Sequence, residues 1–185
     1  MTGAHLGPHP DALGWDATSP CELPRHRRML VDQLLANAAV TRPNKRAVVF
    51  DDRTLTFAEL DALTNRAANG LIAVGVRPGD VVAIVAGNSP ETMALIYGIS
   101  RAGGAVLPLN PRNTPDEITF CIDDVGAAFR VGTPGGHTID DVLAASTSDE
   151  DPMIDVDETG YFQVRFTSGT TGKPKAVARH NGRSH

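Results

Sequence analysis

Apolar residues change their spacing several times along this chain, and each change marks an expected helix or strand. Residues 1–28 have no apolar periodicity, which predicts a loosely ordered lead-in. A first helix, ending before Pro43, is predicted by apolar residues spaced as on one helical face: Leu30, Leu34, Leu35 and Ala38. Residues 46–51 (RAVVFD) and 53–57 (RTLTF) then predict two short strands that form a hairpin around Asp51 and Asp52.

The strongest helix signal begins at residue 56. Thr56 and Glu59 have the spacing of a capping box, in which the hydroxyl accepts from the third amide and the carboxylate accepts from the first. Gly75 supplies a C-terminal stop. Between these ends runs an apolar stripe at helical spacing: Leu60, Leu63, Ala67, Leu71 and Val74.

Two continuous apolar runs of strand length follow, at residues 80–87 (DVVAIVAG) and 105–110 (AVLPLN). Such runs are typical of parallel strands that are covered on both faces. Ser89 and Pro90 have the pattern of a helix start between them, and residues 102–104 end that helix. Pro108 cannot donate to a ladder, so it predicts a strand end or an edge strand.

The second half of the chain continues the alternation. Thr114, Pro115 and Glu117 predict another capped helix, whose apolar face is Ile118, Cys121, Ile122 and Val125. Residues 127–132 (AAFRVG) predict a strand and residues 139–146 (IDDVLAAS) a short helix. Repeated strand–helix–strand units imply right-handed crossovers, so we expect an α/β fold with a mainly parallel sheet.

Residues 146–160 are polar and acidic, and they precede a plausible strand at 161–167 (YFQVRFT). The carboxylates lack the spacing and the glycine of a calcium loop, so a solvated connection is favoured over a divalent cation site. Cys121 is interpreted as a small core residue rather than a nucleophile, because no His or cation accompanies it in sequence. His5 and His9 have no acidic or thiol partner, which disfavours a metal site there.

Composition narrows the class of protein. The chain has 185 residues, 41% of them hydrophobic, and a formal net charge of -5, which gives no electrostatic reason to expect nucleic acid as a partner. Its two cysteines, Cys21 and Cys121, are too far apart in sequence to suggest a disulfide framework or a zinc site. No secretory signal is visible and the longest apolar run cannot span a bilayer, so we expect no transmembrane segment and a cytoplasmic setting.

The segment richest in potential ligand-binding groups is the loop from Thr167 to Lys175, which predicts a phosphate-binding site. Its glycines allow amides to approach an anion, its hydroxyls donate hydrogen bonds and its lysines supply charge. It is not a Walker P-loop, because Thr167 stands where that motif has its first glycine and Pro174 follows Lys173. Since Gly, Ser, Thr and Pro also dominate ordinary turns, a surface turn stays open as an alternative. The candidate binding residues are Thr167, Ser168, Gly169, Thr170, Thr171, Gly172, Lys173 and Lys175.

This loop resembles the signature loop of the adenylate-forming (AMP-binding) superfamily: acyl-CoA synthetases, luciferases and the adenylation domains of nonribosomal peptide synthetases. Three upstream stretches resemble family motifs in the right order: LTFAEL (55–60), GVRPGDVVAIVAGNSPE (75–91) and SRAGGAVLPLNPR (100–112). The segments LPLN and PRNTPDEI are most similar to those of acyl-CoA synthetases for fatty or aromatic acids. Residues 29–177 are thereby identified as an incomplete part of the family's large N-terminal domain, and residues 178–185 as an atypical tail.

The resemblance implies ATP-dependent conversion of a carboxylic acid to an acyl-adenylate with release of pyrophosphate, then transfer to coenzyme A. It implies that the loop closes over the β and γ phosphates and that magnesium shares this task. Ala176 departs from the family's glycine, and His180 lacks the hydroxyl that usually precedes the family's histidine, so it receives no role.

The family's adenine, acyl and magnesium sites and its catalytic lysine have no counterpart in this chain. We therefore expect no catalytic residue, no metal ligand and no adenylation by the 185 residues alone. Two hypotheses stay open. One is an N-terminal portion of an acyl-CoA ligase, cut by a frameshift, by deliberate truncation or by an incomplete gene sequence. The other is a non-catalytic remnant or binding module that keeps only the phosphate loop. In the second case an uncovered sheet edge and apolar face would favour aggregation or association with a complementary fragment.

Overall fold

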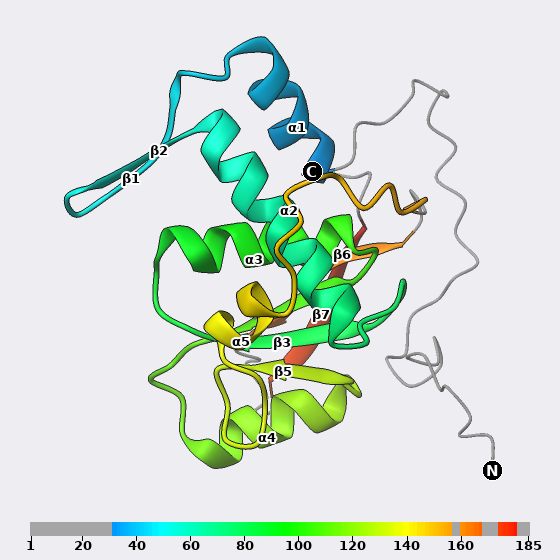
Figure 1. The fold of residues 1–185 in the computed structure, drawn as a ribbon. Coiled ribbons are helices and arrows are strands. Elements are labelled where there is room, and N and C mark those ends of the chain that lie inside the picture. The colour runs from blue at the N-terminus through cyan, green and yellow to red at the C-terminus, as the bar shows by residue number, and fades with distance from the viewer. Residues whose placement is uncertain (1–30, 157–159, 168–173, 181–185) are drawn as a thin grey trace.

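Helices cover both faces of a five-stranded sheet in the computed structural model, which describes residues 31–156, 160–167 and 174–180 (Figure 1). The sheet has the order β5-β3-β4-β6-β7. Its first four members run parallel, whereas β7 is antiparallel to β6. The predicted α/β fold with a mainly parallel sheet is confirmed. The strands are β3 (Val81–Val85), β4 (Ala105–Leu109), β5 (Phe129–Val131), β6 (Tyr161–Thr167) and β7 (Lys175–His180).

The predicted first helix and hairpin are both present, and the hairpin projects from the body of the molecule (Figure 1). They are α1 (Val31–Thr41), β1 (Arg46–Phe50) and β2 (Arg53–Thr56). Asp51 makes the tight turn with a φ of 52°, which aspartate tolerates better than most residues. Arg53 Nη2 donates to Glu91 Oε1 over 2.6 Å, which ties the hairpin to the next layer.

The helices α2 (Phe57–Ala73) and α3 (Pro90–Arg101) pack closely against each other. The predicted capping box at the start of α2 is confirmed: Glu59 N donates to Thr56 Oγ1 over 3.3 Å, and Thr56 N donates to Glu59 Oε2 over 2.8 Å. The close approach is made possible by Gly98, where an added Cβ would lie 2.9 Å from Ala67 Cβ. Gly75, with a φ of 103°, follows the end of α2 as expected.

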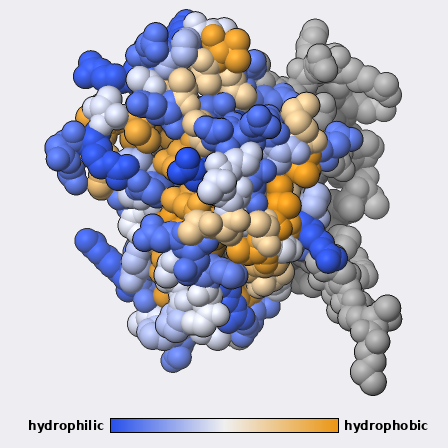
Figure 2. Space-filling view, viewed as in Figure 1, coloured by the Kyte–Doolittle hydropathy of each residue, from blue (hydrophilic) through white to orange (hydrophobic). Residues whose placement is uncertain are grey.

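The two faces of the sheet have separate cores. On one face α2, α3 and α5 (Ile139–Ala144) pack on side chains that include Val82, Val106 and Val131. On the other face α4 (Pro115–Asp124) packs through Cys121 and Ile122 on alternate residues of the same strands. The predicted capped start of α4 and the predicted short helix α5 are both confirmed, and α5 also begins with a capping box at Thr138. On the side seen in Figure 2, hydrophobic residues gather mainly near the middle, with a further group near the upper rim.

The structure corrects one expectation about Pro108. It does not lie on an edge strand, because β4 is bordered by β3 and β6. It is instead the penultimate residue of β4, so the alternative expectation of a strand end is the one that holds. The register of β4 with β6 is recorded at Val106 and Gln163, which places Pro108 beyond that pairing. Its missing N–H therefore leaves the recorded β4–β6 pair intact.

The acidic connection before β6 was expected to be merely solvated, but it is fixed on α2. Asn65 Nδ2 donates to the carbonyl of Asp149 over 2.8 Å. Asn69 Nδ2 donates to the carbonyl of Glu150 over 2.8 Å and to that of Ser148 over 3.3 Å. Most of its carboxylates are nevertheless exposed, as expected. Because amides bind its backbone, the path of this segment is set by helix side chains.

Asn65 also belongs to a buried polar cluster that is centred on Arg101. Arg101, 2% exposed, donates through Nη1 to Asn65 Oδ1 and through Nη2 to Asp61 Oδ1, the latter over 2.9 Å. The Arg101 charge is thereby paired, which a buried guanidinium requires. Asp61, Asn65 and Asn69 follow one another at four-residue spacing on α2, so one polar face of the helix serves both α3 and the connection.

The two edges of the sheet differ. Beside β5, His137 forms a parallel bridge with Val131, so the chain covers that edge with its own loop. Within the described parts of the chain no strand pairs with the outer side of β7. None of the helices in these parts is both long and apolar enough to cross a bilayer.

Candidate phosphate-binding site

The predicted loop is held at the end of a β-hairpin. Thr167 is the last residue of β6 and Lys175 the first of β7, and the two are partners in the antiparallel register. Thr167 Oγ1 also donates a long hydrogen bond, 3.4 Å, to the carbonyl of Lys175. The base of the loop is therefore fixed by strand pairing, which brings Thr167 and Lys175 side by side.

Thr167 and Lys175 are the members of the predicted set that the structure describes, and both are exposed. The other six lie outside the described residues, and their role remains a prediction: Ser168, Gly169, Thr170, Thr171, Gly172 and Lys173.

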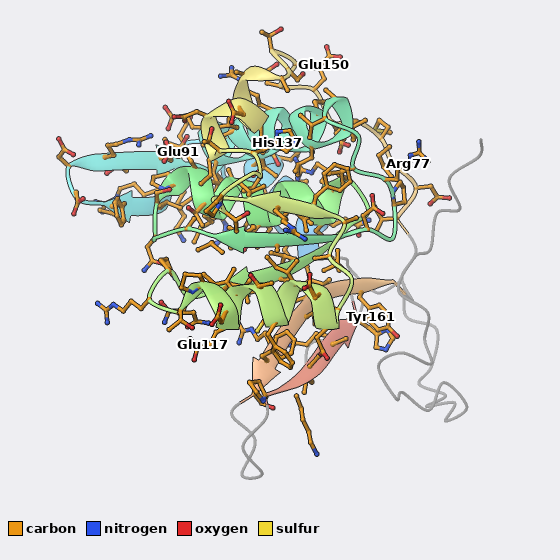
Figure 3. The ribbon with its side chains drawn as sticks, turned by 90° about the horizontal axis from the view of Figure 1, so that it is seen from below. Arg77, Glu91, Glu117, His137, Glu150 and Tyr161 are labelled. Carbon is orange, nitrogen blue, oxygen red and sulfur yellow. The ribbon has the colours of Figure 1, made fainter. Side chains whose placement is uncertain are left out.

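The hairpin places the loop at the carboxyl edge of the sheet. Because β3, β4 and β6 are parallel, their carboxyl ends lie on the same side. In Figure 3, Glu117 on α4 lies toward this edge and Tyr161, the first residue of β6, lies toward the other. Ligands of open α/β sheets bind outside the carboxyl ends of the strands. The position of the loop thus fits a ligand site.

A tight turn borders the site where β4 leads into α4. Asn110 Oδ1 accepts from the backbone N–H of Arg112 over 2.9 Å, and the carbonyl of Asn110 accepts from that of Asn113 over 3.0 Å. These bonds satisfy the turn locally and leave the Arg112 side chain exposed. Arg112 therefore adds a cation to the same edge as Lys175.

Two carboxylates near this edge, those of Glu91 and Glu117, accept hydrogen bonds. Glu117 Oε2 accepts from the backbone N–H of Thr114 over 2.8 Å, in the capping box of α4. The hydrogen bond from Arg53 is the main reason that the pKa of Glu91 lies below its usual value, so this pair is charged on both sides and neutral as a whole. Lys175 and Arg112 have no ion pair within the described ranges, so both cations are available to an anionic ligand.

The inner face of the hairpin explains why Ala176 is tolerated. Ala176 and Ala178 pack with Phe166 on the core beneath α4, and the rings of Phe166 and Phe120 lie 6.2 Å apart. The non-glycine residues with a positive φ in the described chain are Asp51 and Met153. The backbone at Ala176 therefore needs no glycine, so alanine is tolerated at this position.

His180 lies at the end of the hairpin that is remote from the loop. Its ring stacks on that of Tyr161 with centroids 4.8 Å apart, and the two residues are partners in the register. Burial raises the pKa of the Tyr161 hydroxyl. His180 therefore lies away from the loop ends at Thr167 and Lys175. The pairing also shows that β7 continues through residue 180, past the boundary predicted at residue 177.

The donor set of the loop fits a polyphosphate, because hydroxyl, backbone and ammonium donors are the groups that bind phosphate oxygens. The chain has three lysines, and Lys173 and Lys175 are two of them. For a metal ion, the described residues contain no group of three or more His, Cys, Asp or Glu side chains placed to bind one. Cys121 is buried, which raises the pKa of its thiol above the usual value and fits its interpretation as a core residue.

Sequence reasoning missed β7 and the amide contacts of α2. The signal for β7 was the alternation of residues 175–180, whose exposed and half-buried positions follow a period of two. The signal for the contacts was the four-residue spacing of Asp61, Asn65 and Asn69 beside an apolar stripe.

Comparison with known sequences gives a consistent result. The sequence model of the family described as AMP-binding enzyme matches residues 35–184. Malpinin synthetase of Mortierella alpina is 33% identical over 182 residues, which are 91% of this chain and 2% of that protein. This chain therefore corresponds to a small part of its much longer relative.

Solved structures agree in fold. The N-terminal domain of FACL13 from Mycobacterium tuberculosis, solved with an inhibitor, superposes with a TM-score of 0.75 at 27% identity, over 83% of this chain and 44% of that one. The O-succinylbenzoate coenzyme A synthetase of Bacillus subtilis, solved with AMP, gives a TM-score of 0.70 at 28% identity, over 79% of this chain and 41% of that one. The chain spans less than half the length of these structures.

Proposed function

The chain belongs to the AMP-binding enzyme family, and on that premise we propose that its β6–β7 hairpin binds the phosphates of ATP during activation of a carboxylic acid. The observation that supports this most directly is the position of the loop. Paired strands hold its two ends at the carboxyl edge of a parallel sheet, beside exposed cations. A donor-rich loop anchored there is suited to orient a polyphosphate.

The role proposed for the loop is electrostatic and positional. ATP, when bound, supplies the adenylyl group, and pyrophosphate is the group that leaves. Lys175 would lie beside the leaving phosphates, and Thr167 would support it by fixing the base of the hairpin. Preorganised donors of this kind lower the barrier because they are in place before charge develops. Magnesium would bind the same phosphates, through ligands that we do not assign to this chain.

The finer proposal is that the parent activity is an acyl-CoA ligase, with coenzyme A as the thiol acceptor. It is supported by the sequence of residues 107–118 (LPLNPRNTPDEI) and by the coenzyme A synthetase among the structural neighbours. Relatives by sequence are mostly peptide synthetases, which favours an adenylation domain of that kind as the second candidate. Both candidates use the same first step, so the loop has the same role in each.

For the 185 residues alone we propose phosphate binding without turnover. The chain spans 44% of the N-terminal domain chain of FACL13, and we assign it no catalytic residue and no metal ligand. We expect no exchange of pyrophosphate into ATP with any carboxylic acid. Measurable exchange from pure material would contradict this part of the proposal without affecting the phosphate-binding role.

The chain carries its own control for a binding experiment. Its lysines are Lys45, the residue that precedes β1, and Lys173 and Lys175 in the loop. We expect tripolyphosphate to protect Lys173 and Lys175 from acylation in a dose-dependent way, as read by mass spectrometry of each site. Lys45, which is exposed and lies outside the β6–β7 hairpin, should react at the same rate throughout. Equal protection of all three lysines, or of none, would overturn the assignment.

In a longer enzyme that contains this segment, Lys175→Ala and Thr170→Ala should slow adenylation, by about 10²-fold if each removes one donor to the developing charge. Affinity for coenzyme A should change little. A similar loss in both steps would show that the substitutions disturb the fold rather than the phosphate contact.

A further inference from the structure

The outer face of the β6–β7 hairpin is charged and exposed, and no helix of the described residues covers it. Cross-strand partners point to the same face of a sheet, so Arg165 and Val177 lie together, flanked by Lys175 at one end and Arg179 at the other. All four residues are exposed, Val177 by 47%. The opposite face of the hairpin, with Val164 and Phe166, is packed beneath α4. We call the exposed side, defined by Arg165, Lys175, Val177 and Arg179, the cationic face.

The three cations have no ion pair within the described parts of the chain. Diagonal neighbours on a sheet lie about 7–8 Å apart, so Arg165 repels both Lys175 and Arg179. Like charges around an exposed valine are relieved when an anionic surface with an apolar centre covers them. The cationic face therefore defines the chemistry of its partner.

A surface of that chemistry exists on the same chain. In the acidic connection, Asp151, Met153 and Asp155 are exposed, while the residues between them are half-buried. Met153 is 82% exposed, and its backbone N–H donates to Asp151 Oδ1 over 2.8 Å. The connection thus presents one apolar side chain between two carboxylates. We call Asp151, Met153 and Asp155 the acidic knob.

The acidic knob is held in place rather than left as a free loop. The residues just before it are bound to α2 by Asn65 and Asn69, through bonds of 2.8 Å to the carbonyls of Asp149 and Glu150. A segment that is already ordered loses less conformational entropy on binding. This makes the knob suited to dock on a preformed surface.

We propose that two copies of this chain form a symmetric dimer in which the acidic knob of each copy docks on the cationic face of the other. A two-fold interface requires a self-complementary surface, in which one patch meets the other and the reverse contact follows by symmetry. The two patches have opposite charge and each has an exposed apolar centre, Met153 in one and Val177 in the other. Each dimer contains the contact twice, so a weak individual contact is reinforced.

The alternative occupant of the cationic face is an anionic polymer such as polyphosphate. It would bind the same three cations but would not need Met153 or the carboxylates of the knob. The two occupants are therefore distinguished by whether the acidic residues matter.

The first test is the mass of the full 185-residue chain by sedimentation velocity, over about 1–200 µM protein, at salt concentrations of about 0.05 and 0.5 M, which span strong and weak screening. We expect a shift from the 19.6 kDa monomer to twice that mass at low salt, and a weaker dimer at high salt. A monomer at every concentration would overturn the proposal. So would a monomer that binds polyphosphate through Arg165, Lys175 and Arg179, since the face would then belong to the polymer.

The second test is a charge exchange. Arg179→Glu and Asp155→Lys should each weaken dimerisation about tenfold or more, because each change acts twice in the dimer. The double variant should recover most of the loss, which no effect on folding alone would produce. Arg46→Glu and Asp52→Lys, on the remote β1–β2 hairpin, are matched controls and should leave the dimer unchanged. Absence of recovery, or equal effects of the controls, would refute the contact; Arg179→Gln and Asp155→Asn repeat the test if a reversal unfolds the chain.

Discussion

The contact between α2 and α3 gives the sharpest quantitative prediction, through Gly98→Ala. In a helix interior this change normally stabilises by about 1 kcal/mol, because alanine has the better helix propensity. Here the new Cβ would lie 2.9 Å from Ala67 Cβ, 3.0 Å from the Ala68 nitrogen and 3.2 Å from the Thr64 carbonyl oxygen. Two of these three neighbours are backbone atoms, which cannot rotate away. Relief therefore requires the helices to separate.

Separation of the helices is resisted by the ion pair between them. Arg101 Nη2 on α3 and Asp61 Oδ1 on α2 are 2.9 Å apart, and Arg101 is buried. Overpacking of such a site costs about 1–3 kcal/mol. Set against the gain in propensity, the net effect is a destabilisation of about 1 kcal/mol, which lowers the melting temperature of a domain of this size by about 2–4 °C.

Thermal unfolding followed by circular dichroism measures this change, and a double-mutant cycle isolates its cause. Ala67→Gly removes the atom nearest to the new Cβ, so the pair Gly98→Ala with Ala67→Gly should lose less stability than the sum of the single changes. A rise in melting temperature for Gly98→Ala would refute the reasoning, because it would mean that the helices move apart freely. Strict additivity would show that Ala67 is not the obstacle.

Three further predictions concern the bonds from Asn69 to the acidic connection and the N-terminal caps of α4 and α2. Asn69→Ala should speed hydrogen exchange in the acidic connection and lower stability by about 1–2 kcal/mol, because it removes the donor to the carbonyls of Ser148 and Glu150; Asn88→Ala, at an exposed loop residue, is the control. Thr114→Ala should cost about 1 kcal/mol in urea unfolding, since it removes the cap of α4. Glu59→Gln should flatten the acid side of the stability–pH curve, because the backbone hydrogen bond from Thr56 lowers the pKa of Glu59.

The sign of the last prediction follows from the direction of the shift. A carboxyl group whose pKa is lower in the folded state stabilises the fold above its unfolded pKa, near 4.5, and loses that contribution as the pH falls through the folded value. The wild type should therefore lose stability more steeply than Glu59→Gln below about pH 4.5. Parallel curves would contradict the capping role. For Asn69→Ala, unchanged hydrogen exchange in the acidic connection would contradict the prediction. For Thr114→Ala, an unchanged midpoint of urea unfolding would contradict it.

Local chemistry made most of the elements predictable. The capping boxes at Thr56 and Thr114 depend on residues three positions apart, so the sequence displays them completely. The order of the strands depends on contacts between distant residues, and it placed Pro108 in the interior of the sheet, where propensity alone does not put a proline. The strand β7 escaped notice because its exposed positions, Lys175 and Arg179 among them, dilute the apolar signal of a half-buried strand.

The candidate site, like the fold, was predictable from the sequence only in part. The chemistry of the loop was readable from its glycines, hydroxyls and lysines, and its identity came from the resemblance. Its location at the carboxyl edge required the parallel register of β4 with β6, which no local pattern encodes. The bond from Asn65 to Asp149 joins residues 84 positions apart, so only the folded chain reveals that the acidic connection is anchored.

The recorded ladder between β4 and β6 has a consequence for the order in which the chain folds. It joins Val106 to Gln163, whereas β3, α3 and β4 are neighbours in sequence and contact one another directly. Closing a long loop is entropically unfavourable until other contacts offset it, so distant pairings form late. We expect pulse-labelling hydrogen exchange to protect the amides that join β3 to β4 before those that join β4 to β6. The β6–β7 hairpin, whose own pairing is local, would then be the last part of the sheet to dock.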